Sequence, residues 1–383
     1  MKCRHCQSEL TVSLIDLVTS PPSNAYLTQQ ELQATEKYFP LRVLVCTDCW
    51  LVQTEDYAGA DELFSSDYAY FSAFSSSWLK HSEQYVTNMV DRFDLDGQSY
   101  IVEVAANDGY LLQYVKARGI PCLGIEPTTS TADAARKKGI EIIEDFFGVE
   151  LANKMVEQGK QADLTAANNV LAHVPDINDF VGGFAALLKP TGVSTFEFPH
   201  LLQLVSENQF DTIYHEHYSY LSLTAVKKIF ESNGLSVFDV EILPTHGGSL
   251  RVYAQRIDTG SHKTSDNVIK ILDQEKSAGM NSVDFYAGFQ AKADRVKNDF
   301  LSFLLEAKLT GKTVAGYGAA AKGNTLMNYA GVRQDLLSYV VDLNPAKQDK
   351  FLPGSRIPIV GEKYIRKTQP DYVVIFPWNL RSE

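Results

Sequence analysis

The chain has 383 residues, of which 45% are hydrophobic and 21% charged, a composition that is ordinary for a globular protein of two or three domains. Its formal net charge of −12 argues against a nucleic-acid or anionic-membrane partner, because phosphate binding needs a basic face. No run of 18 apolar residues predicts a membrane span, and the N-terminus lacks the apolar core of a signal peptide. We therefore expect a cytoplasmic protein, in which cysteines stay reduced.

The first unit, predicted over residues 1–65, carries two cysteine pairs with the spacing of zinc knuckles. Cys3 and Cys6 form the first pair, and Cys46 and Cys49 form the second. Four thiolates satisfy a tetrahedral Zn²⁺ and leave no open position, so the spacing predicts a structural zinc ion. The loop between the pairs is longer than in common zinc fingers. Four unrelated buried cysteines are the alternative.

An alternation of strands and helices follows and predicts a mostly parallel sheet with helices on both faces. Expected strands cover residues 100–105, 122–126, 140–144, 164–168 and 193–198, and two antiparallel strands over 237–243 and 250–256 finish the sheet. A long helical tract over 264–308 then leads to a second alternating region with strands over 313–316, 338–342 and 371–376. We place one domain over residues 66–257 and the last over 258–383.

The turn after the first strand of the larger sheet is the predicted cofactor site. A tight turn that opens onto a helix accepts nucleotide-like ligands, and this one holds a single glycine. S-adenosylmethionine (SAM) has no pyrophosphate that needs bare backbone, which favours SAM over a dinucleotide or a generic α/β domain. We expect Glu126 to bind the ribose hydroxyls and Glu103 to lie near the cationic end of SAM. The full set of expected cofactor residues is Glu103, Ala105, Asn107, Gly109, Glu126, Pro127, Asp145, Asn168 and Asn169.

Residues 214–220 hold two imidazoles, one carboxylate and three phenols, with no aliphatic residue among them. A structural segment would carry apolar residues at a regular period. This segment instead offers groups that donate or take protons near neutral pH. With the cofactor turn upstream, the pattern points to a methyl-transferring enzyme that must first remove a proton.

Several motifs resemble, in the same order, those of the three-domain SAM-dependent sugar C-methyltransferases. They are the two cysteine pairs, EVAANDG (103–109), NVLAHVPD (169–176), YHEHYS (214–219), HGGSLR (246–251) and GYGAAAKG (316–323). Such enzymes, as in tetronitrose biosynthesis, add a C-methyl group to nucleotide-linked keto-deoxysugars. The resemblance implies an N-terminal zinc-binding unit, a central Rossmann-like SAM domain and a C-terminal Rossmann-like α/β domain. It also implies a further helix and strand beyond the PWNL motif at 377–380.

The resemblance implies a 4-keto sugar that loses its C3 proton before the methyl group is delivered to C3. A carbon next to a ketone becomes a nucleophile when a base takes its proton and the enolate oxygen is stabilised. We expect His217 to be the base, because a neutral imidazole has its pKa near the working pH. Glu216 is a candidate carboxylate partner or hydroxyl binder, and Tyr214 a donor to the enolate oxygen or a positioning group.

Five further residues are candidates for the same cleft. His173, in the loop after the fourth strand, is expected to face it and to assist the proton transfer or bind the ketone oxygen. The resemblance implies a tyrosine close to sugar and cofactor, either Tyr68 or Tyr70, with packing as the alternative. His246 and Arg251 are candidates for binding the substrate, although a strand end explains them as well.

The last domain contains a strand, a glycine turn and a helix over residues 314–323, and Asp342 ends the next strand. Taken alone, this fits a dinucleotide fingerprint in which Ala321 replaces the third glycine. Methyl transfer needs no hydride, so we expect the domain to bind the sugar nucleotide, with Gly318 and Lys322 available to its diphosphate. A structural domain that walls the cleft is the alternative.

The sequence thus predicts a C-methyltransferase that acts on a dTDP-linked or other nucleotide-linked 4-keto-deoxysugar, with SAM and a structural Zn²⁺ as cofactors. Three functions compete with it. They are SAM-dependent methyl transfer to oxygen or nitrogen, a zinc-ribbon regulator bound to nucleic acid, and an NAD-dependent sugar oxidoreductase. The net charge of −12 weighs against the regulator. The nucleotide base, the exact sugar, the face of methylation and the oligomeric state stay open.

Overall fold

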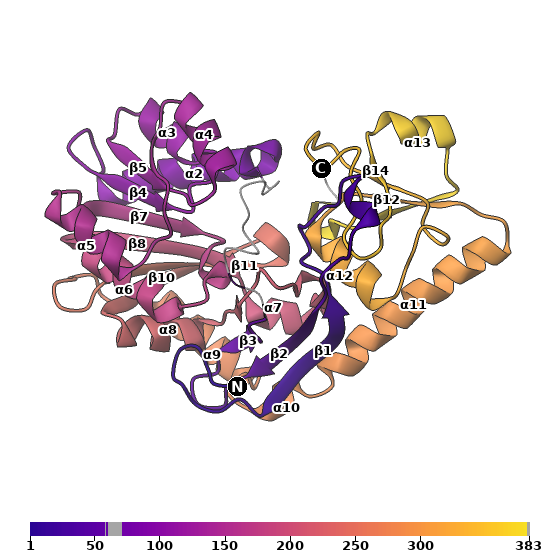
Figure 1. Ribbon diagram of the computed structural model, residues 1–383. Helices are drawn as coiled ribbons and strands as arrows, with labels where there is room; N and C mark the ends of the chain where they lie inside the picture. The colour runs from indigo at the N-terminus through magenta and orange to yellow at the C-terminus, as the bar shows by residue number, and fades with distance from the viewer. Residues whose placement is uncertain (58, 60–70, 381–383) are drawn as a thin grey trace.

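The computed structural model describes residues 1–57, 59 and 71–380, and their strands form three sheets (Figure 1). The candidate residues Tyr68 and Tyr70 lie outside the described residues. Within the described ranges, no helix has both the length and the apolar character needed to cross a membrane. The predicted α/β architecture, with a small N-terminal unit before two sheets with parallel strands, is confirmed.

The N-terminal sheet is antiparallel and has the order β1-β2-β3-β9. Its first three strands are β1 (Val12–Ser20), β2 (Phe39–Val45) and β3 (Val52–Thr54). The fourth, β9 (Ser219–Tyr220), comes from residues 214–220, the histidine-rich segment, far along the chain. Most of this sheet has no regular sequence period, because β1 is irregular and β3 and β9 are only three and two residues long.

The central sheet has the order β10-β11-β8-β7-β4-β5-β6. Its strands are β4 (Ile101–Val104), β5 (Cys122–Ile125), β6 (Glu141–Ile143), β7 (Ala162–Asn168), β8 (Leu188–Pro199), β10 (Leu235–Leu243) and β11 (Ser249–Arg256). The pairs from β8 to β6 are parallel, and β11 and β10 add antiparallel pairs. The strand expected over 193–198 begins earlier, since β8 starts at Leu188.

Helices cover both faces of the central sheet (Figure 1). One face carries α2 (Ser76–Phe93), α3 (Leu112–Ala117) and α4 (Thr129–Lys137). The other carries α5 (Val149–Glu157), α6 (Ile177–Leu187), α8 (Leu223–Ser232) and α9 (Asp266–Ser277). The remaining short helices of the described chain outside the C-terminal unit are η1 (Glu31–Gln33), η2 (Ser72–Phe74), η3 (Leu171–His173), α7 (Leu201–Ser206), η4 (Phe210–Thr212), η5 (Thr245–Gly247) and α10 (Val283–Tyr286).

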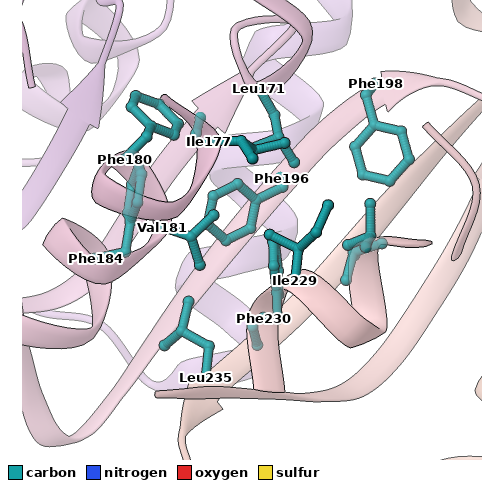
Figure 2. Close-up of a cluster of buried hydrophobic side chains, with 14 of the residues drawn as sticks. Leu171, Ile177, Phe180, Val181, Phe184, Phe196, Phe198, Ile229, Phe230 and Leu235 are labelled. Carbon is teal, nitrogen blue, oxygen red and sulfur yellow. The ribbon is translucent and has the colours of Figure 1, made fainter. Parts of the chain in front are cut away.

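The alternation of side chains along β8 separates the apolar core from a polar network. Phe196 packs between Phe184 of α6 and Phe230 of α8, with ring centroids 4.8 and 4.7 Å away (Figure 2). The next residue, Glu197, faces α2, where its carboxylate lies 2.9 Å from Nε2 of His81. Successive side chains of a strand point to opposite faces, so one strand serves both the core and the polar network.

The C-terminal unit has a parallel sheet in the order β14-β13-β12-β15. Its elements are β12 (Val314–Tyr317), β13 (Val340–Val341), β14 (Ile359–Val360), β15 (Tyr372–Ile375), α11 (Phe289–Leu309), α12 (Ala321–Tyr329), α13 (Lys363–Thr368) and η6 (Trp378–Leu380). The predicted helical tract is divided into α9, α10 and α11, since Gly279 and Gly288 adopt φ values of 87° and 79° that interrupt a helix.

A buried carboxylate on α9 holds the start of α8, directly after the histidine-rich segment. Oε1 of Glu275 accepts hydrogen bonds from the backbone N–H of Leu223 at 2.6 Å and from Nε2 of His200 at 2.7 Å. Oε2 accepts from the backbone N–H of Thr224 at 2.8 Å. The first N–H groups of a helix have no intrahelical partner, so this carboxylate caps α8.

Replacing Glu275 should destabilise the central unit. We expect Glu275→Ala to lower the free energy of unfolding by about 3–5 kcal/mol, because the buried donors would lose their acceptor. Glu275→Gln retains one oxygen and should lose less. Thermal and urea unfolding followed by circular dichroism measure both. Glu150→Ala, which removes an exposed partner of Lys154, is the control and should leave the midpoint unchanged. An Ala variant as stable as the control would contradict the capping role.

Candidate active site

A cavity of about 400 Å³ lies at the carboxyl edge of the central sheet, and residues from all three units line it. The predicted site residues in its wall are Ala105, Asn107, Glu126, Pro127, Asp145, Asn168, Asn169, His173, Tyr214, His217, His246 and Lys322. Asn24, Lys347 and Asn379 also line the cavity and were not among the predicted site residues. The predicted residues outside its lining are Glu103, Gly109, Glu216, Arg251 and Gly318.

The turn after β4 has a left-handed backbone at three positions. The φ angles are 58° at Ala105, 49° at Asn107 and 74° at Gly109. A Cβ on Gly109 would lie 2.4 Å from the side chain of Ile140 and 3.2 Å from Cβ of Ala135, in a backbone conformation that side chains disfavour, so glycine suits this position. Ala105 and Asn107 hold the conformation that glycine adopts most easily. The turn is therefore tight although it contains a single glycine.

The carboxylate of Glu126 closes this turn from the neighbouring strand. Its Oε2 accepts from the backbone N–H of Asn107 at 2.9 Å, and its Oε1 accepts from that of Thr128 at 3.0 Å. Each carboxylate oxygen has a second lone pair that a ligand hydroxyl can use. Oδ1 of Asn169 is buried with no hydrogen-bond partner in the described structure. These acceptors fit the ribose hydroxyls and the ammonium group of SAM.

Glu103 does not reach the cavity, contrary to the expectation that it lies near the cationic end of SAM. Its side chain is fully buried beneath the turn, beside Tyr110. Burial raises the pKa of Glu103 well above the usual carboxyl value, because an anion is poorly solvated there. Glu103 thus belongs to the packing under the turn.

The imidazole of His217 is held in one tautomer by the backbone. Its Nδ1 lies 2.8 Å from the carbonyl oxygen of Thr212, which can only accept, so Nδ1 carries the proton and Nε2 carries the lone pair. The ring centroid lies 4.0 Å from that of Tyr214 and 4.7 Å from that of His173. Burial, and then the neighbouring His173, lower the pKa of His217 well below its usual value. The imidazole is therefore neutral at pH 7.

Glu216 contacts the N-terminal unit and not His217. Its Oε1 accepts from the backbone N–H and from Nδ2 of Asn24, each at 3.1 Å. The carbonyl of Thr212 takes the place of the carboxylate partner that we expected for His217. The neighbouring His215 turns away from the cavity and donates from Nε2 to the carbonyl of Pro40 at 3.2 Å.

Arg251 forms a buried ion pair and does not line the cavity. Its Nη2 lies 2.8 Å from Oε2 of Glu197, and Oε1 of the same carboxylate accepts from the hydroxyl of Thr245 at 2.9 Å. Thr245 precedes His246, whose Nε2 lies 3.1 Å from Nδ2 of Asn169. The ion pair therefore supports the turn that brings His246 to the cofactor side of the cavity.

Lys322 places a half-buried amine at the C-terminal wall of the cavity. Its Nζ donates to Oδ1 of Asn379 at 2.6 Å and lies 4.4 Å from the ring centroid of Trp378. Burial lowers the pKa of Lys322, and the charge of Asp211 opposes this shift. An anionic ligand group would stabilise the charged form, which suits this wall to phosphate.

The glycine turn of the C-terminal unit is filled by the protein itself. The carboxylate of Asp342 accepts from the backbone N–H of Ala319 at 2.7 Å and from that of Asn344 at 2.8 Å. A Cβ on Gly318 would lie 2.5 Å from Cδ of Pro377, so this glycine serves close packing. Asp342, which would hold a ribose in a dinucleotide enzyme, is thus already engaged.

The four predicted cysteine ligands come together in the N-terminal unit. All four Sγ atoms lie within 4.8 Å of one another, and the pairs Cys3–Cys49 and Cys6–Cys46 are each 3.5 Å apart. A tetrahedral zinc ion with Zn–S bonds of about 2.3 Å separates its sulfurs by about 3.8 Å, so the cluster fits zinc. All four tetrahedral positions would be filled by sulfur, as in a structural site.

Comparison with known proteins identifies the family. Three family models match: a zinc binding domain at residues 3–64, a methyltransferase domain at 78–240 and a C-methyltransferase C-terminal domain at 244–383. The chain is 33% identical to C-methyltransferase NovU of Streptomyces niveus over 382 residues, which are 100% of this chain and 90% of that protein. The chain belongs to the C-methyltransferase family. The family predicted from the motifs is thus confirmed, as are its cofactors, SAM and zinc.

Other similarities are confined to part of the chain. The Ubiquinone biosynthesis O-methyltransferase of Bordetella avium is 30% identical over 94 residues, which are 24% of this chain and 39% of that one. The structure of magnesium protoporphyrin IX methyltransferase from Synechocystis PCC 6803 with bound SAM is 16% identical. It covers 46% of this chain and 79% of its own, with a TM-score of 0.36. The family assignment therefore rests on the full-length relative.

We expect about one zinc ion per chain, released when a ligand is removed. Cys49→Ser should lose the metal and destabilise the N-terminal unit, because metal binding contributes directly to the folding of such small units. Metal content by mass spectrometry, with thermal unfolding, tests this. The matched control is Cys122→Ser, in β5 of the central sheet, which should retain zinc. Full zinc occupancy in Cys49→Ser would contradict the assignment.

Proposed function

We propose that this SAM-dependent C-methyltransferase acts on a nucleotide-linked 4-keto-deoxysugar and methylates C3 after removing its proton. The observation that carries the proposal is the neutral imidazole of His217, whose Nε2 lone pair belongs to a side chain of the cavity wall. Methyl transfer to oxygen or nitrogen needs no base for a carbon acid. An imidazole fixed in one tautomer fits the chemistry at carbon.

The proposed proton transfer uses residues of the central unit. Nε2 of His217 takes the C3 proton, and the electron pair of the C–H bond delocalises onto the ketone oxygen. Tyr214 or His173, both beside His217, donates to that oxygen. When bound, SAM supplies an electrophilic methyl group on its sulfonium. Tyr68 or Tyr70 stays a proposed contact to sugar and cofactor, and Glu216 positions the segment.

Binding of the sugar nucleotide is proposed to use the C-terminal wall. Lys322 and Lys347 both line the cavity near the first turn of α12, where backbone N–H groups favour an anion. The diphosphate of the substrate would pair with these amines. This direction places the sugar toward His217 and leaves the acceptors around Glu126 for SAM. His246 completes the proposed wall between the two ligands.

The variant His217→Asn should lose methyl transfer by at least about 10³-fold, because Asn cannot accept the proton. SAM affinity, measured by calorimetry, should stay within about twofold of wild type. Product mass from a panel of keto-deoxysugar nucleotides measures the transfer, and deuterium incorporation at C3 in D₂O measures proton removal separately.

The control is His215→Gln, in the same segment but outside the cavity lining, with an amide nitrogen to replace Nε2 at the Pro40 carbonyl. Its kcat should stay within a few-fold of wild type. Normal C3 exchange and methylation by His217→Asn would reject His217 as the base. Methylation at oxygen or nitrogen in the wild type would reject the proposed reaction.

The pH dependence should show an unusually acidic base. Burial lowers the pKa of His217 well below that of a free imidazole and lowers those of His173 and His246 to about 4. A base is active when unprotonated, so activity is lost only as the pH falls through this lowered pKa. We expect kcat/KM to stay level down to about pH 6.5, the ordinary imidazole value, and to decline below it. A midpoint at or above 6.5 would contradict this.

A further inference from the structure

We propose that Arg4, in the first zinc knuckle, is a positioning residue that sets the relative placement of His173 and His217. The two imidazoles come from separate loops of the central unit, one after β7 and one before β9. Their ring centroids lie 4.7 Å apart. The helices next to the two histidines, η3 and η4, are single short turns. The inference rests on the proposed roles of these histidines.

One guanidinium reaches both loops. Nη1 of Arg4 donates to the carbonyl oxygen of Pro175 at 2.9 Å, two residues after His173. The guanidinium carbon lies 5.3 Å from the ring centroid of Tyr218, the residue after His217. The Arg4 side chain is only 4% exposed, so these contacts form away from water, where they are stronger than at a surface.

Thr54 of β3 connects the same guanidinium to the backbone of His217. Nη2 of Arg4 donates to the carbonyl oxygen of Thr54 at 3.1 Å. The hydroxyl of Thr54 donates to the carbonyl oxygen of His217 at 3.0 Å. The backbone N–H of Thr54 donates to the carbonyl oxygen of Tyr218 at 3.1 Å. Each step is a direct hydrogen bond between described residues, which leaves the loop little freedom to move independently of Arg4.

The zinc knuckle fixes the position of the Arg4 backbone. Arg4 lies between the proposed ligands Cys3 and Cys6, and its backbone N–H donates to Oε1 of Gln53 at 3.0 Å. Beside it, the backbone carbonyl of His5 accepts from Nδ2 of Asn178 in α6 at 2.9 Å. The knuckle is thus attached to β3 of the N-terminal sheet at Arg4 and to α6 of the central unit at His5, so the metal would hold the guanidinium in place between the two loops.

The experiment compares Arg4→Met and Arg4→Lys with wild type and with the control Arg42→Met. Arg42 lies in β2 of the N-terminal sheet, pairs with Glu55, and touches neither histidine loop through an observed hydrogen bond. The readouts are zinc content, SAM affinity, kcat and KM, and the imidazole cross-peaks of His173 and His217 in NMR spectra. The last of these does not depend on turnover.

We expect Arg4→Met to keep zinc and SAM affinity, to shift both imidazole cross-peaks, and to lower kcat by about 10- to 100-fold with little change in KM. Arg4→Lys should fall between Met and wild type, because one amine cannot bridge two carbonyls and Asp56 as the guanidinium does. Arg42→Met should match wild type in every readout.

Unshifted imidazole cross-peaks with wild-type kcat in Arg4→Met or Arg4→Lys would overturn the positioning role. Loss of zinc from both variants would also overturn it, since Arg4 would then serve only the folding of the N-terminal unit. The function proposed for His217 fails separately, through normal C3 exchange in His217→Asn. Shifted cross-peaks in Arg4→Met would still report the placement of both rings in that case.

Discussion

The pairing of β3 with β9 is the contact on which the active-site geometry depends. It joins three residues near the N-terminus, Val52–Thr54, to two residues that follow the histidines, Ser219–Tyr220. Residues 214–220, which carry His217, contain no described helix or strand other than β9. Their shape is therefore imposed by the sheet that β9 joins. The small metal-binding unit is therefore joined through backbone hydrogen bonds to the segment that carries His217.

Features encoded within a few residues could be predicted from the sequence. Two cysteines separated by two residues reach one ion, and the described Sγ atoms do cluster. The strands of the central sheet follow from alternating apolar runs, and the tight turn at 105–109 follows from its place between strand and helix. The unusual composition of 214–220 drew attention to a segment of which Tyr214, His217, Ser219 and Tyr220 line the cavity.

Partners across long sequence distances could not be predicted. Glu216 binds Asn24, 192 residues away, and Arg251 binds Glu197 on the adjacent strand rather than a ligand. A residue type and its period indicate which face it occupies, but not which group meets it there. The same limit applies to Glu103, because the sequence does not distinguish a strand-end acid that is buried beneath the turn from one that faces a ligand.

The missing side chain at Gly318 has a mechanical consequence. Cδ of Pro377 lies 2.5 Å from the position that a Cβ on residue 318 would take. The turn before α12 therefore packs directly against Pro377. Lys322 and Asn379 flank this contact, and Nζ of Lys322 lies 2.6 Å from Oδ1 of Asn379. A bulkier residue at 318 would push Pro377 away from the turn and enlarge the cavity on this side. The size of ligand that the enzyme accommodates would then change without any substitution among the residues that touch the ligand.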